Sequence, residues 1–467
     1  MAARTTTVGL FLAILWGLTS AAQAQVGNTM LPPESLLNRH GLTRMWWGQA
    51  TMNSGRDKLQ YITLDDERIY VQTSNGIVSA FDAESGKRLW ATTVGVGDRP
   101  NFPATYDDDW LFIINGASLY GVKKTNGDVL WELRLPGPPS ASPAPSDKQI
   151  YVGTLDGSVY AFQMRKIVGE GLVRTRKASL KKDDFETTSS KIPTSIEGLH
   201  EDNLLPEWGF RSLLWRYKTS ERIVAPPVPI GDRLLFVSEN GTMYHVNRIT
   251  RDLVYRFKTN GALSAPMATY KSTILLASED LTLYSVDLAR GGIRWQYVAG
   301  LPIQKPPLVV ADEVFLMPTR GGMLRLSAEK GDDRSVFWRQ PLVEDLVSIS
   351  PERVYATDAR HNLVVLSRQS GAALGAVPLS RFSKFFQNTR NDRLYMATES
   401  GLVIALRETS REFPFVHLDV DRQPVMPTFT PEGEAGGTGS AQPPAPGNTE
   451  PETKGEAEPN PASESLN

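Results

Sequence analysis

Eight short apolar runs recur along this chain at a spacing of about 40 residues, and this repeat limits what the chain can fold into. The centres of the runs are Tyr70, Leu111, Tyr151, Leu235, Leu275, Phe315, Tyr355 and Tyr395. The gaps between successive centres are 41, 40, 84, 40, 40, 40 and 40 residues, so one gap holds an insertion of 44 residues. A period of this length, built from short apolar runs and turns, is typical of a β-propeller. We therefore predict an all-β, eight-bladed propeller whose blades are sheets of four antiparallel strands.

The fifth repeat shows the expected strands most plainly. Its β-branched and aromatic runs cover residues 264–270, 273–278, 282–287 and 293–298, and short polar turns separate them. Four such strands with their turns use about one period. One four-stranded unit cannot bury its apolar face alone, so neighbouring units must stack.

The N-terminal part of the chain supplies a spare strand. Residues 44–52 (RMWWGQATM) resemble the fourth strand of a repeat, such as residues 88–93 (RLWATT). We expect this strand to join the eighth sheet and close the ring, because closure removes open sheet edges. The propeller then covers residues 44–423. Residues 25–43 lead into it with a short helix that has Pro33 at its start and Gly41 after its end.

A large aromatic residue stands about 20 residues after most centres, on the expected outer strand. Such a side chain suits packing between adjacent sheets, since one indole ring buries on the order of 200 Å². The residues expected in this role are Trp47, Trp90, Trp131, Trp215, Tyr255, Trp295 and Trp338. The seventh repeat has only Leu374 and Gly375 at this place.

Glycines mark the turn between the second and third strands of several repeats. They follow an Asn, Asp or Ser, and these pairs supply the positive φ angles that tight hairpins need. The glycines are Gly76, Gly157, Gly241 and Gly401.

Two segments fall outside the repeat. The insertion, residues 164–208, has mostly basic residues first and mostly acidic residues after them; it is either a solvated loop or an arm that binds a partner. Residues 424–467 are rich in Pro, Gly and Glu, with seven Glu and one Lys. That composition predicts a disordered acidic tail.

The first 24 residues resemble a secretory signal, with Arg4, an apolar run over residues 8–18 and the sequence Ala-Gln-Ala at residues 22–24. No other stretch is apolar enough to span a membrane. The chain has no cysteine, which excludes disulfides, thiolate metal sites and thiol catalysis. Its net charge of −2 gives no indication of a nucleic-acid surface. We expect an exported, extracytoplasmic monomer.

Residues with catalytic or metal-binding potential are scattered. The five histidines lie far apart in the sequence, and none has a metal-site spacing to another histidine or a carboxylate. The acidic runs 65–66 and 107–109 have oxygen ligands suited to calcium, but they also stand where turns are expected. A Gly-x-Ser-x-Gly elbow is absent. The sequence therefore predicts no catalytic residue, no metal site and no cofactor.

Residues 75–90 (NGIVSAFDAESGKRLW) resemble the repeat of the pyrroloquinoline quinone (PQQ)-like propellers, and residues 119–131 and 283–295 are weaker copies. The resemblance covers about residues 44–410. Membership of one branch, the quinoprotein alcohol dehydrogenases, would imply PQQ, calcium and an adjacent pair of cysteines. This chain has no cysteine. The other branch, the non-catalytic BamB-like envelope propellers, is similar in size, repeat number and export. The BamB-like propellers carry a lipid-bearing cysteine, and this chain has none.

The resemblance therefore favours a non-enzymatic scaffold of the bacterial cell envelope, with unidentified envelope proteins as its partners. The alternative is a binding module for PQQ or a carbohydrate in the axial funnel. A quinoprotein dehydrogenase comes third, because the cysteine pair is missing. Fold does not determine function, so these remain hypotheses.

Overall fold

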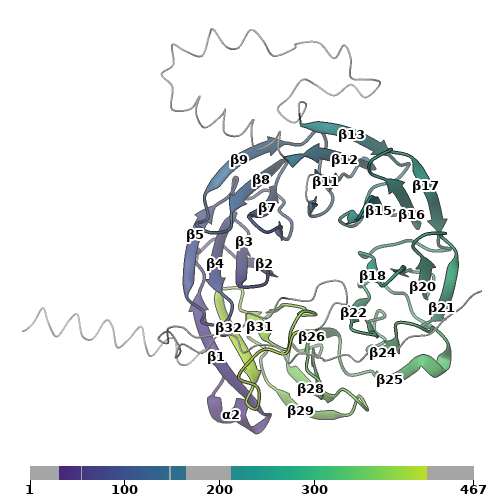
Figure 1. Cartoon of the computed structure of the whole chain (residues 1–467). Helices are drawn as coiled ribbons and strands as arrows, with labels where there is room; N and C mark the ends of the chain where they lie inside the picture. The colour runs from purple at the N-terminus through teal and green to yellow at the C-terminus, as the bar shows by residue number, and fades with distance from the viewer. Residues whose placement is uncertain (1–30, 54, 147–148, 165–211, 418–467) are drawn as a thin grey trace, which may run out of the picture. The chain divides into compact units, whose positions relative to one another are not determined.

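The computed structural model describes residues 31–53, 55–146, 149–164 and 212–417. These residues form eight sheets of four strands each around a central axis (Figure 1). Neighbouring strands within every sheet are antiparallel. The predicted eight-bladed propeller is confirmed.

The blades are numbered in chain order. Blade 1 contains β2 (Leu59–Leu64), β3 (Arg68–Thr73), β4 (Ile77–Asp82) and β5 (Arg88–Thr93); blade 2 contains β6 (Thr105–Tyr106), β7 (Trp110–Asn115), β8 (Ser118–Lys123) and β9 (Val129–Arg134). Blade 3 contains β10 (Ala144–Pro145), β11 (Gln149–Gly153), β12 (Ser158–Gln163) and β13 (Leu213–Lys218); blade 4 contains β14 (Val228–Ile230), β15 (Arg233–Ser238), β16 (Thr242–Asn247) and β17 (Leu253–Lys258). Blade 5 contains β18 (Ala268–Tyr270), β19 (Thr273–Ala277), β20 (Thr282–Asp287) and β21 (Ile293–Val298); blade 6 contains β22 (Leu308–Val310), β23 (Glu313–Leu316), β24 (Met323–Ser327) and β25 (Val336–Gln340). Blade 7 contains β26 (Asp345–Ile349), β27 (Arg353–Thr357), β28 (Leu363–Ser367) and β29 (Ala373–Val377); blade 8 contains β30 (Lys384–Phe385), β31 (Leu394–Ala397), β32 (Leu402–Glu408) and β1 (Leu42–Gln49).

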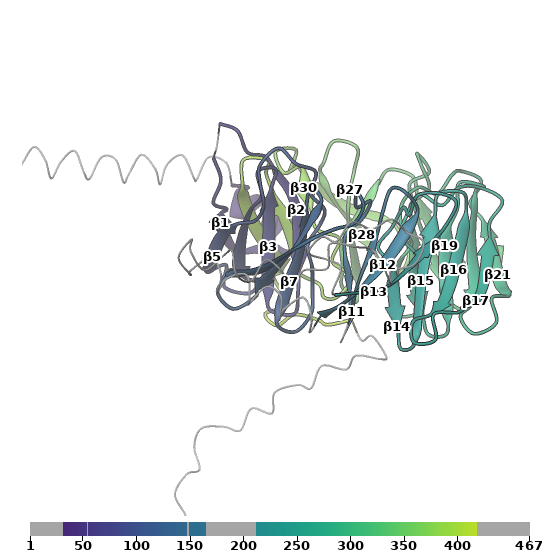
Figure 2. The same ribbon diagram turned by 90° about the horizontal axis from the view of Figure 1, so that it is seen from above.

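Each blade begins at the axis and ends at the circumference, where β9, β13, β17 and β21 are visible in Figure 1. Seen from the side, the blades lie in a single layer (Figure 2). One face of this layer carries the links between blades and the turns between second and third strands; we call it the connection face. The other face carries the remaining turns, and we call it the opposite face.

The ring is closed by the N-terminal strand, as the sequence predicts. β1 pairs antiparallel with β32, from Leu42 beside Glu408 to Gln49 beside Leu402. In Figure 1 the purple β1 lies against the yellow-green β32. The short helix α2 (Glu34–Arg39) precedes β1. The last blade is thus built from both ends of the described chain.

The core lies between the blades. Both faces of each sheet are covered by a neighbouring blade, so the second and third strands are buried along most of their length; all five residues of β19 are buried, for example. The apolar cluster between blades 1 and 2 is typical, since it joins Tyr70 and Val78 of blade 1 to Leu111 and Val122 of blade 2.

Three expected segments lie largely outside the described residues. These are the 1–24 signal, the 424–467 tail and the 164–208 insertion. The strands that flank the insertion are described: β12 ends at Gln163 and β13 begins at Leu213. In the part of the chain that the structure describes, no helix is long and apolar enough to cross a membrane.

Candidate interaction surface

In the blades other than blade 7, a large aromatic residue of the outer strand packs toward the next blade, and Trp90 shows the geometry. Its ring lies against Gly127 of blade 2, where φ is +79° and where a Cβ atom would come within 2.5 Å of the ring. The indole Nε1 donates a hydrogen bond of 2.8 Å to the carbonyl oxygen of Lys124 in the same turn. A tryptophan on this strand therefore joins two blades by packing and by one hydrogen bond.

The same contact recurs at other blade junctions. Trp338 lies on Gly371 of blade 7 and donates to the Arg368 carbonyl oxygen at 2.8 Å. Tyr255 lies on Gly291 of blade 5, and its hydroxyl donates to the Leu288 carbonyl oxygen at 3.0 Å. The ring of Trp295 lies against Gly331 of blade 6.

Trp131 and Trp215 are buried as well, but their Nε1 atoms have no hydrogen-bond partner among the described residues. Trp131 packs on Gly121 of its own blade and beside Trp110, with 6.1 Å between ring centroids. Trp215 packs in an apolar cluster with Leu234 and Val246 of blade 4, where Arg251, with φ at 70°, stands in place of the usual turn glycine. Trp131 of blade 2 and Trp215 of blade 3 therefore lie at the two junctions of blade 3, the blade that carries the insertion.

The expectation for Trp47 needs a correction, because Trp46 occupies the packing position. Trp46 is 7% exposed and donates from Nε1 to the Ala83 carbonyl oxygen of blade 1 at 2.8 Å, whereas Trp47 is 50% exposed. Successive side chains of a strand point to opposite faces. Trp46 stands beside Ala405 in the register, as Trp90 stands beside Ala80, so only Trp46 faces the next blade.

Blade 7 lacks an outer aromatic residue, and the lead-in segment fills the gap. The ring of His40, just after α2, lies so close to Gly375 of β29 that a Cβ atom there would approach its Nδ1 to 2.5 Å. The Arg353 guanidinium holds this segment by donating to the His40 carbonyl oxygen at 2.9 Å. A residue from outside the repeat thus takes the tryptophan's place.

The four turn glycines lie on the connection face, between second and third strands. Their φ angles run from 80° to 88°. Each also lies against the link to the next blade; a Cβ at Gly157, for instance, would meet the Glu221 carbonyl oxygen at 2.5 Å. Both the φ angle and the close contact require glycine.

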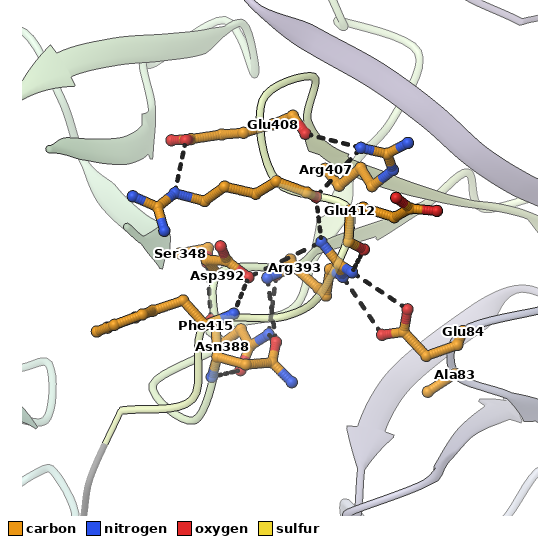
Figure 3. Close-up of polar contacts among 12 residues, drawn as sticks. Ala83, Glu84, Ser348, Asn388, Asp392, Arg393, Arg407, Glu408, Glu412 and Phe415 are labelled. Carbon is orange, nitrogen blue, oxygen red and sulfur yellow. Dashed lines mark hydrogen bonds and ion pairs between the residues drawn. The ribbon is translucent and has the colours of Figure 1, made fainter. Parts of the chain in front are cut away.

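A buried arginine lies at the seam where the ring closes. Arg393, at the start of β31, has no exposed side-chain surface. Its guanidinium donates to both carboxylate oxygens of Glu84 in blade 1 at 3.3 Å, and to the carbonyl oxygens of Arg411 and Glu412 at 3.2 and 2.5 Å (Figure 3). One side chain therefore joins blade 8, blade 1 and the segment that follows β32.

That segment, residues 409–417, returns across the opposite face toward the axis. Asp392 accepts from the Phe415 backbone at 2.9 Å, and burial raises the pKa of its carboxyl group (Figure 3). His417 donates its backbone N–H to the Arg390 carbonyl oxygen at 2.8 Å, and its Nε2 lies 2.9 Å from the Ile349 carbonyl oxygen. Burial lowers the pKa of the His417 ring to about 4, so the ring is neutral at pH 7 and Nε2 carries the donated proton.

Three apolar side chains of this segment face solvent although its backbone is fixed. Phe413 is 81% exposed, Phe415 39% and Val416 42%. We call these three residues the C-terminal pad. A fixed, exposed apolar patch of this kind is typical of a surface that contacts another protein.

The sequence gives no sign of the Arg393 contacts. Arg68, Arg233 and Arg353 occupy the equivalent place in other repeats, so a charged residue there is ordinary. The pairing of Arg393 with Glu84 joins residues more than 300 positions apart, which a repeat pattern does not reveal.

The acidic residues and histidines that could bind a metal do not come together in the described part of the chain. In the stretches 31–53, 55–146, 149–164 and 212–417, no group of three or more His, Asp or Glu side chains could hold a metal ion. Asp65 pairs with Lys124 at 2.8 Å and Asp66 pairs with Arg390 at 2.7 Å, so both carboxylates already have cationic partners. The chain also lacks the cysteine pair. These residues do not fit a PQQ–calcium site.

The eight repeats, the tryptophan contacts on glycine turns and the N-terminal closing strand together define a PQQ-like eight-bladed propeller. The model of the family described as "Outer membrane protein assembly factor BamB" matches residues 74–166 and 248–412, more than half of the chain. The chain therefore belongs to the BamB family.

Two curated relatives carry the name outer membrane protein assembly factor BamB. The protein of Moranella endobia (strain PCIT) is 23% identical over 242 residues, which are 46% of this chain and 62% of the relative. The protein of Burkholderia pseudomallei (strain K96243) is 28% identical over 118 residues, 25% of this chain and 30% of the relative. The chain thus matches less than two thirds of the length of either relative.

Solved structures show the same fold. The crystal structure of BamB from Moraxella catarrhalis superposes with a TM-score of 0.58 and 15% identity, covering 80% of this chain and 99% of that one. The computationally designed protein Ika8 superposes with a TM-score of 0.55 and 12% identity, covering 77% and 99%.

Proposed function

We propose that this chain is a non-catalytic scaffold of the bacterial cell envelope that holds other envelope proteins; its curated relatives are named outer membrane protein assembly factors. Membership of the BamB family carries the proposal. The apolar run of residues 8–18 and the small residues after it support export to that compartment.

The chemistry of the described residues agrees with this proposal. The buried guanidinium of Arg393 joins segments of the propeller through Glu84 and two carbonyl oxygens. The exposed apolar side chains of the C-terminal pad are held by backbone hydrogen bonds, so little ordering is needed when a partner binds. Rigid blades that present such surfaces suit a scaffold.

Crosslinking in the envelope tests the proposal. A photoreactive amino acid at Phe413 should form adducts with other envelope proteins, which mass spectrometry would identify. The same amino acid at Ile249, which is 72% exposed on the opposite face of blade 4, is the matched control. If neither the pad nor any other exposed position gives an adduct, the scaffold role is refuted.

The insertion needs a separate experiment. Deleting residues 164–208 leaves the crosslinks unchanged if the insertion is a solvated loop, and removes at least one if it is a binding arm. Because Gln163 and Leu213 end and begin paired strands, a short glycine linker can join them without disturbing β12 or β13.

A further inference from the structure

The outer strand of a propeller blade has an unpaired edge, because each sheet ends there. Natural proteins protect such edges from pairing with other chains, and charged side chains are one means of doing so. Seven of the eight outer strands, all within the described residues, carry an arginine. These residues are Arg44, Arg88, Arg134, Arg216, Arg256, Arg294 and Arg339.

The outer strand of blade 7 is different. β29 has the sequence Ala-Leu-Gly-Ala-Val, with no charged residue and no aromatic residue. The side chain of Leu374 is 57% exposed, and Ala376 is exposed too. Among the described residues, the hydrogen bonds of β29 run to β28 on its inner side. This edge is therefore uncharged, apolar and open.

β29 is also held firmly. Trp338 packs on Gly371 at the turn before the strand, and the Gln340 side chain donates to the Gly371 carbonyl oxygen at 3.0 Å. His40 covers Gly375 in the middle of the strand, and Pro378 follows its last residue. A strand fixed in this way is ready to pair, because little conformational entropy is lost on binding.

We infer that β29 is a docking edge that accepts an extended segment of another envelope protein as a fifth strand of blade 7. The inference rests on the proposed scaffold function. Only an extended backbone can satisfy a row of strand N–H and C=O groups. The segment should be uncharged where it faces Leu374 and Ala376, because a charge there would lose hydration without gaining a partner.

A second copy of the chain fits this edge less well. Two paired strands of five residues bury far less than the roughly 1,200 Å² of a standard protein interface. A different protein can contribute contacts beyond the added strand, for example to the C-terminal pad. The pad is linked to β29 through Gly41, whose carbonyl oxygen accepts from Thr409, and the neighbouring His40.

A defined peptide tests the edge directly. We would add an acetylated, amidated (Thr-Val)3 peptide to the full-length protein and follow backbone amide exchange. We expect slower exchange at residues 373–377, lost in Leu374→Lys and kept in the matched control Val254→Lys on β17, where the side chain is 51% exposed. Equal protection on β17 and β29, or none on β29, overturns the inference. Far-ultraviolet circular dichroism confirms that both variants fold.

Crosslinking separates this inference from the scaffold proposal. A photoreactive amino acid at Leu374 should form an adduct with a different envelope protein that Ala376→Lys abolishes. An adduct with a second copy of the chain refutes the hetero-partner. No adduct at Leu374, with adducts from the C-terminal pad, refutes the docking edge and leaves the scaffold role standing. No adduct from any position refutes both.

Discussion

At the residue scale, single side chains join blades that lie far apart in sequence. The indoles of Trp46, Trp90 and Trp338 are the clearest case, since each fills the space above a glycine turn and donates to a carbonyl oxygen of that turn. Whether a tryptophan has this role depends on which face of its strand it occupies, and Trp46 and Trp47 show that adjacent residues differ completely.

Replacing Trp90 should reveal this contribution. Trp90→Phe removes the hydrogen bond to the Lys124 carbonyl oxygen and part of the buried ring, and we expect a loss of about 1–3 kcal/mol in the free energy of unfolding. Trp47→Phe is the control, expected to stay within about 0.5 kcal/mol. Urea denaturation measures both; equal losses would show that the contact with the next blade is unimportant.

His417 should make stability depend on pH. Its folded pKa of about 4 lies below the ordinary value of 6.5, so between these values the unfolded chain binds the extra proton. The neutral His417 ring therefore makes its full contribution to the free energy of unfolding above pH 6.5. This contribution, up to about 3 kcal/mol, is lost as the pH falls toward 4. His417→Gln should flatten the pH dependence of Tm across this window, and an unchanged profile would contradict the assignment.

At the element scale, turns decide how blades meet. The turns at Gly76, Gly157, Gly241 and Gly401 need positive φ and leave no room for a side chain, because the link to the next blade lies directly against them. The outer strands differ mainly in their charges, and β29 shows that one exception can change what an edge is able to bind.

A glycine substitution tests the turn argument. Gly241→Ala places a Cβ at φ 86° and against the Gly261 carbonyl oxygen, and we expect a loss of about 1–3 kcal/mol. At Gly292 a Cβ would meet nothing within 4 Å, so Gly292→Ala should be neutral or slightly stabilising. Chemical denaturation of the two variants provides the comparison, and an equal effect at both positions would refute the steric reason.

At the scale of the whole molecule, the ring depends on one seam, where β1 completes blade 8 and Arg393 joins blade 8 to blade 1. A buried guanidinium is favourable only because Glu84 and two carbonyl oxygens surround it. Removing it leaves those acceptors without their donor.

Arg393→Met should therefore lower the free energy of unfolding by about 3 kcal/mol. It should also raise hydrogen exchange at residues 411–417, which lose one of their attachments. Glu84→Gln is the matched control: it keeps the carbonyl contacts, and the Glu84 side chain is 51% exposed, so we expect a smaller loss. Normal exchange at 411–417 in Arg393→Met would show that the segment is held by other contacts alone.

The sequence by itself determined the architecture, because the 40-residue period is a local property that every blade repeats. Eight apolar runs meant eight sheets, and residues 44–52 matched a missing fourth strand, which β1 supplies. The alternation of side chains within a strand is also local, yet the sequence prediction chose Trp47 of the two adjacent tryptophans, and the register of β1 shows that Trp46 faces the next blade.

Only the tertiary structure decided the contacts that do not repeat. His40 on Gly375, Arg393 with Glu84, and His417 at Ile349 join residues from 68 to more than 300 positions apart. The unprotected edge of β29 likewise required knowing which strand lies outermost in each sheet. A periodic pattern records what the blades share, because every blade meets the same packing demand. The contacts of Arg393 and the uncharged edge of β29 occur where one blade differs from the others. Which residues meet at the seam depends on how the ring closes.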